Sequence, residues 1–125
     1  MANLNIFTTS IFINTFDKQE FLDQIRKELK SEQNKNYQVK KSNVGGFQTN
    51  NLKNSVIENY IIKNSFSLLN DKYTTLNPTE VAIKNFWINV NYKNSWNLPH
   101  QHPNSNFSGV FYLEVPKDSG NLIFF

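Results

Sequence analysis

The chain has 125 residues, no cysteine and a formal net charge of +3 at neutral pH. This length suits a single domain, and a chain without cysteine has no disulfide framework, thiolate metal site or cysteine nucleophile. The positive charges are dispersed and do not interleave with aromatic residues, so no clear nucleic-acid surface is predicted. The N-terminus lacks a signal-peptide pattern and no apolar run reaches the roughly 18–20 residues of a membrane span. We therefore expect one domain over 1–125, without membrane contact, in the cytoplasm.

The first elements predicted along the chain are a strand and a helix. Residues 5–16 are rich in β-branched and aromatic side chains, which is typical of a strand. Asp17 and Glu20 have the spacing of a capping box, and the apolar periodicity that follows predicts a helix over 17–30. The helix face expected to be buried consists of Phe21, Leu22, Ile25 and Leu29.

A polar segment and a second helix follow. Residues 31–50 contain Gly45 and Gly46 and predict a loop with room for short strands. Helical periodicity returns over 52–69, and residues 71–78 predict a turn. The residues of this second helix expected to face the core are Leu52, Val56, Tyr60, Ile61 and Leu68.

In the second half of the chain the apolar period changes to two. Residues 79–94 predict a strand. One face carries Ala82, Phe86, Ile88, Val90 and Tyr92, interrupted by Lys84, and the other carries Val81, Ile83, Trp87, Asn89 and Asn91. The second face turns polar along its length, as expected if its end lines a cavity. Further strands are predicted to begin at 100–102 and to run over 107–115 and 121–125, with a turn at 116–120. Helices followed by strands predict an α+β fold with an antiparallel sheet.

His100 and His102 are the only histidines of the chain, and prolines flank them. In a strand, residues two apart point to the same face, about 7 Å apart along the chain, with Gln101 facing away. Two imidazoles suit iron, zinc, copper or nickel, but they do not complete a site. The alternative for so short a pattern is a pair of exposed polar side chains.

The segment NFWINVNYKNSWNLPHQHPNSNFSGVFYLEVPKDSGNLIFF, residues 85–125, resembles the putative 2OG-Fe(II) oxygenases, a branch of the iron- and 2-oxoglutarate-dependent dioxygenases of marine bacteria and phages. The shared features are a W-I-N strand, an N-x-x-H-x-H-P turn, an S-G-V-x-Y-L strand and a P-x-x-S-G turn. The earlier stretch SNVGGFQT, residues 42–49, is similar to another segment of that family, and IFTTSIF to its opening strand. Several ordered motifs make this resemblance far more specific than the histidine pair alone.

The resemblance implies a double-stranded β-helix, or jelly roll, with N-terminal helices, which binds Fe(II) and uses 2-oxoglutarate and O2 to hydroxylate an unidentified substrate. His100 matches the first iron ligand. His102 stands where the wider superfamily has a carboxylate, so it either binds the metal or lies beside a bound water. Tyr112 matches a tyrosine that hydrogen-bonds the distal carboxylate of 2-oxoglutarate, and its alternative role is that of a core aromatic.

Other residues near these motifs have simpler interpretations. Trp87 is expected in the core. Asn89, Asn91 and Asn97 are expected to be surface amides, because asparagine is abundant throughout this chain, and the alternative is that they line the mouth of the cavity.

In the family, a third metal ligand and a basic partner for 2-oxoglutarate follow further along. We therefore expect 1–125 to be the N-terminal portion of a dioxygenase domain, truncated after the early core strands and inactive by itself. The alternatives are a non-catalytic jelly-roll binding or phage-associated structural module, and a cupin-like zinc or manganese protein.

Overall fold

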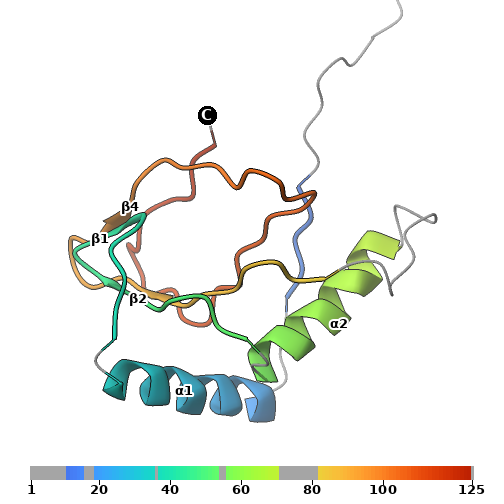
Figure 1. Ribbon diagram of the computed structural model, residues 1–125, viewed down its shortest axis with the longest axis horizontal. Coiled ribbons are helices and arrows are strands. Elements are labelled where there is room, and N and C mark those ends of the chain that lie inside the picture. Colours follow the sequence, from blue (N-terminus) through green and yellow to red (C-terminus); the bar gives the residue numbers. More distant parts are fainter. Residues whose placement is uncertain (1–10, 16–18, 36, 54–55, 71–81, 125) are drawn as a thin grey trace, which may run out of the picture.

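The computed structural model describes residues 11–15, 19–35, 37–53, 56–70 and 82–124. Within these residues the chain forms two helices and short antiparallel strands, as the α+β prediction requires (Figure 1). None of the helices described is both long and apolar enough to cross a lipid bilayer. The elements in chain order are α1 (Gln19–Asn34), β1 (Asn43–Val44), β2 (Phe47–Gln48), α2 (Val56–Asn70), β3 (Asn89–Val90) and β4 (Trp96–Asn97).

The strands form two antiparallel pairs, β1 with β4 and β2 with β3. Backbone hydrogen bonds continue the second pairing beyond the strands. The amide of Thr49 donates to the carbonyl of Ile88 at 3.0 Å, and the amide of Leu52 donates to the carbonyl of Phe86 at 2.7 Å. This pairing places the segment that follows β2 alongside the segment that leads into β3.

The two glycines between β1 and β2 are required by the local geometry. Gly45 has a φ of +77°, a conformation that side-chain-bearing residues rarely adopt. A Cβ atom on Gly46 would collide with the side chain of Asn43 and the carbonyl oxygen of Val90. Gly46 therefore allows the turn to pack closely against β3.

The core lies between the two helices and the β2–β3 side of the molecule. Phe21 and Ile25 of α1 and Ile57 of α2 are buried together. In Figure 1 the helices lie along one edge of the molecule, and the strands with the C-terminal segment lie on the other side of them. The half-buried residues that pack against the core are Tyr60, Ile61, Phe86, Ile88, Phe111 and Leu113.

The first predicted helix is confirmed, with Phe21 and Ile25 on its buried face as expected. It extends to Asn34, so the beginning of the predicted loop is helical. The strand expected at 5–16 lies largely outside the described residues, and its described part, 11–15, has no strand structure.

The second helix begins later than predicted, at Val56. Leu52 is not helical, because its backbone amide is bonded to the strand segment at Phe86. Val56 was expected in the core, but its side chain is 56 % exposed, and Ile57 is buried instead at 3 %. One residue turns the direction of a side chain by about 100° around a helix, so a shift of one position exchanges core and surface. Tyr60 and Ile61 contact the core as predicted, whereas the turn predicted at 71–78 and the side chain of Leu68 lie outside the described residues.

The predicted strand 79–94 is reduced to β3, although its alternation holds where it is described, with Phe86 and Ile88 facing the core. The strands expected at 100–102, 107–115 and 121–124 do not form. A strand requires a partner for its backbone groups. Among the described residues, one backbone hydrogen bond beyond β4 runs from the amide of Leu98 to the carbonyl of Ser42. The turn predicted at 116–120 is present at 117–118. The jelly roll as a whole stays a prediction.

Candidate functional site

Both histidines line one pocket of about 340 Å³, here called the histidine pocket. A small-molecule site typically has a volume of about 300–1,000 Å³. Segments that are far apart in sequence form its wall, because β1 pairs with β4 and β2 pairs with β3. The residues that line the histidine pocket are Lys41, Ser42, Gln48, Asn51, Asn85, Trp87, His100, Gln101, His102, Pro103 and Ser105.

His100 is oriented by a contact with its own backbone segment. Its Nδ1 atom lies 2.7 Å from the carbonyl oxygen of Leu98. Because a carbonyl oxygen only accepts, Nδ1 carries the proton and donates it, which leaves the lone pair on Nε2. A histidine that binds a metal usually donates its other ring N–H in this way. The tautomer of His100 therefore suits a metal ligand.

His102 lies against the ring of Trp87, with 5.5 Å between the ring centres. His102 is exposed overall, but partial desolvation of its ring lowers its pKa below the usual value, and the neighbouring His100 lowers it further. Both effects favour the neutral imidazole, which is the form that binds a metal.

The two imidazoles are close enough to share one metal ion. Their ring centres are 4.8 Å apart and their planes are inclined by 80°. Metal–nitrogen bonds of about 2.0–2.1 Å would place two imidazoles on adjacent positions of one ion with their centres roughly 4.5 Å apart. The prediction that both histidines face one cavity agrees with this geometry. Because 100–102 is not a strand, Gln101 lines the same pocket and does not face away.

No cluster of three or more His, Cys, Asp or Glu residues able to hold a metal occurs within the described parts of the chain. The histidine pair therefore offers two potential metal ligands, and no such cluster completes a site around it among those residues.

The amides of Gln48 and Asn51 are held by backbone groups at the pocket wall. The Oε1 atom of Gln48 accepts from the amide of Asn43 at 3.4 Å, and the Oδ1 atom of Asn51 accepts from the amide of Phe86 at 2.7 Å. Sequence reasoning missed both residues. The only available signal was the resemblance of 42–49 to a family segment, and it did not say which side chains enter a pocket.

Trp87 was expected in the core, but it is half-buried and lines the histidine pocket. The alternation of the strand explains this position, because Phe86 and Ile88 take the core face and Trp87 points the other way. Asn89, Asn91 and Asn97 are exposed and are not among the residues that line the pocket, as expected of surface amides.

Tyr112 does not join the histidines among the residues that line the pocket, and its side chain is 57 % exposed. Its neighbours Phe111 and Leu113 pack against the core, so Tyr112 points away from that core. A contact between Tyr112 and 2-oxoglutarate stays a prediction from the resemblance.

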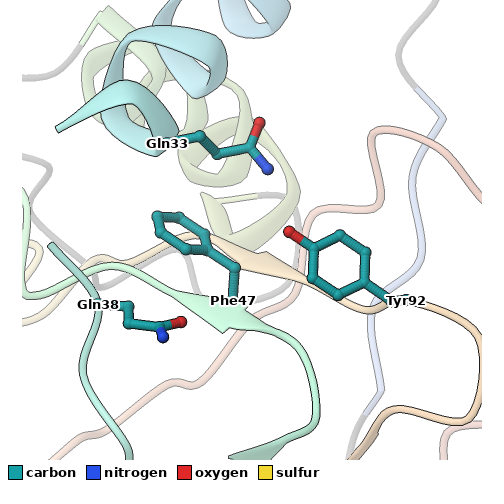
Figure 2. Close-up of a pocket in the computed structure, with 4 residues that line it drawn as sticks. All are labelled: Gln33, Gln38, Phe47 and Tyr92. Carbon is teal, nitrogen blue, oxygen red and sulfur yellow. The ribbon is translucent and has the colours of Figure 1, made fainter. Parts of the chain in front are cut away.

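A second pocket of about 190 Å³ lies on the other face of β2 (Figure 2). Figure 2 shows the ring of Phe47 among the side chains of Gln33, Gln38 and Tyr92. Adjacent residues of a strand point to opposite faces, so Phe47 lines this pocket and Gln48 lines the histidine pocket. The side chains of the second pocket are amides and aromatic rings, which are not typical metal ligands.

Comparison with known protein families finds a match for the C-terminal third of the chain. Residues 85–125 match the model of the family described as "Putative 2OG-Fe(II) oxygenase". No curated protein and no solved structure matches the chain. The resemblance is thus confirmed over the segment that contains Trp87, His100 and His102, and the family description names Fe(II) and 2-oxoglutarate. For residues 42–49 the resemblance stays a prediction.

Proposed function

We propose that this chain forms part of an Fe(II)- and 2-oxoglutarate-dependent dioxygenase that hydroxylates its substrate, with His100 and His102 as two iron ligands. The observation that carries the proposal is the hydrogen bond from His100 Nδ1 to the carbonyl of Leu98, which leaves the lone pair on Nε2 in a ring whose centre is 4.8 Å from that of His102. The family match of residues 85–125 gives this pair a chemical context.

The side chains around the pair fit such a metal. Trp87 packs on His102 and keeps water from part of its ring, which favours the neutral form. The backbone carbonyl of Leu98 holds the ring of His100 in one orientation. Bound there, Fe(II) supplies the chemistry of this class, in which a C–H bond, 2-oxoglutarate and O2 are converted to C–OH, succinate and CO2. The third protein ligand belongs, in this proposal, to residues other than those described.

The first test measures metal binding by the histidine pair. Fe(II) is titrated without oxygen in the presence of 2-oxoglutarate, and visible charge-transfer absorption reports chelation. His100→Ala should weaken Fe(II) binding by at least the roughly 10–100-fold that follows loss of an outer-shell partner. Asn106→Ala is the control, because Asn106 is exposed and does not line the pocket. Equal titration curves for the original chain and His100→Ala would rule out this ligand assignment.

His102→Asp tests the unusual second position. If His102 binds the metal, aspartate restores the carboxylate of the wider superfamily and adds a negative charge next to the cation, so Fe(II) binding should persist or strengthen. Succinate release under air is measured in parallel on the longer protein, with O2 and 2-oxoglutarate supplied, because residues 1–125 are expected to be inactive by themselves. Loss of succinate release with unchanged Fe(II) binding would instead show that His102 orients water or substrate.

A further inference from the structure

The most informative side chain outside the histidine pair is Gln48. It lines the histidine pocket, yet only 3 % of its surface is exposed. The amide of Asn43 can only donate, so the atom that accepts from it is the oxygen of Gln48. The NH2 group of Gln48 is thereby left for the pocket, and it has no partner among the described residues.

Asn51 repeats this arrangement on the same stretch of chain. Its oxygen accepts from the amide of Phe86, which leaves its NH2 group as a second donor in the pocket. Lys41 adds a positive charge, and its ammonium makes no ion pair with any described residue. Three donors therefore come from the segment 41–51.

Among the described residues, no Asp or Glu lines the histidine pocket. A wall with an ammonium, two NH2 groups and no carboxylate is complementary to an oxyanion, because carboxylate and phosphate oxygens only accept. We propose that Lys41, Gln48 and Asn51 form a binding site for a carboxylate or phosphate group of the hydroxylation substrate, beside the histidine pair. The assignment to a substrate rests on the proposed function, whereas the binding of an oxyanion does not require iron.

The experiment uses the metal-free chain and two probes, inorganic phosphate and acetate, with acetamide as a neutral comparison. Heteronuclear NMR follows the side-chain NH2 signals, which are assigned by their disappearance in Gln48→Glu and Asn51→Asp. We expect both anions, but not acetamide, to shift these signals in a saturable way. Signals that stay unchanged with both anions would overturn the proposal.

The variants are chosen to keep the fold. Gln48→Glu and Asn51→Asp each keep an oxygen for the backbone amide and replace the NH2 donor in the pocket with a negatively charged oxygen. Each should weaken phosphate binding by roughly 10–100-fold, as expected for loss of a hydrogen bond to a charged group. Lys41→Met, at an exposed position, should also weaken it. Gln38→Glu makes the same charge change in the second pocket and is the matched control. An equal loss in the control would show only a general charge effect and would contradict the proposal.

A final measurement separates substrate from co-substrate. With Mn(II) as a redox-inactive stand-in for iron, phosphate and 2-oxoglutarate should bind together. If phosphate displaces 2-oxoglutarate, the oxyanion site belongs to the co-substrate, and the assignment to a substrate is wrong. If the chain binds anions but no metal, the oxyanion site is supported and only the proposed function is contradicted.

Discussion

At the scale of single residues, backbone groups orient the polar side chains of the histidine pocket. The carbonyl of Leu98 holds one nitrogen of His100, and backbone amides hold the oxygens of Gln48 and Asn51. In each case the backbone takes one end of the side chain and determines which atom is left for the pocket. The chemistry of the site is thus set by hydrogen bonds that involve no ligand.

His102 should titrate below the ordinary histidine pKa of about 6.5, because burial and the neighbouring His100 disfavour its charged form. The unfolded chain then binds more protons than the folded chain between the two pKa values. His102 therefore contributes its full stabilisation when the pH is above its pKa in the unfolded chain. This contribution is lost as the pH falls through its pKa in the folded chain. An NMR titration of the metal-free chain measures this pKa. Trp87→Ala should raise the pKa of His102 towards its usual value, and a further decrease would contradict burial as the cause.

At the scale of elements, the exact starting residue of α2 determines which of its side chains reach α1. The pairing of Leu52 with Phe86 keeps the preceding segment extended, so the helix begins at Val56 and Ile57 enters the core beside Ile25. Adjacent residues of one helix thereby have opposite environments.

Ile57→Ala and Val56→Ala form a matched pair for testing this register. Ile57→Ala should lower the free energy of unfolding by about 2–5 kcal/mol, because it leaves a cavity between the helices. Val56→Ala should change it by no more than about 0.5 kcal/mol, because the side chain is exposed. Urea unfolding followed by circular dichroism measures both values. The reverse order would place Val56 in the core and would show that the helix is rotated.

At the scale of the whole molecule, packing is concentrated around the helices and the β2–β3 pair. The segment 114–124 is exposed along its length, and the ion pair of Glu114 with Arg26, 3.0 Å long, connects it to α1. Exposed ion pairs contribute little to stability. Local stability should therefore differ sharply between these regions.

Amide hydrogen exchange should show this difference. The amides inside α1 and those of Thr49 and Leu52 donate to carbonyls and should be protected. The amides of 114–124 have no backbone acceptor among the described residues and should exchange close to their intrinsic rates. Exchange followed by NMR at neutral pH measures this for each residue. Strong protection throughout 114–124 would indicate ladder bonding that the described structure does not contain.

Local spacing in the sequence was sufficient for several features. Periodicity located α1 with Phe21 and Ile25 on its buried face, and the glycine pair marked the turn between β1 and β2. The motifs around His100 and His102 led to the family that residues 85–125 match. All of these depend on residues close together in the chain, where side-chain direction follows directly from helix or strand geometry.

The tertiary structure alone decided which residues surround the histidines. Gln48 and Asn51 line the same pocket as Trp87 because the backbone from 47 to 52 pairs with the backbone from 86 to 90. Lys41 lines this pocket as well, because the pairing of β1 with β4 brings the segment before β1 close to the histidines. The bond between Leu52 and Phe86 keeps the segment before α2 extended, so α2 begins at Val56 and not at Leu52. Residues 107–115 do not form a strand. Contacts of this kind depend on which backbone groups find partners far away in sequence, and local hydrophobic patterns do not specify those partners.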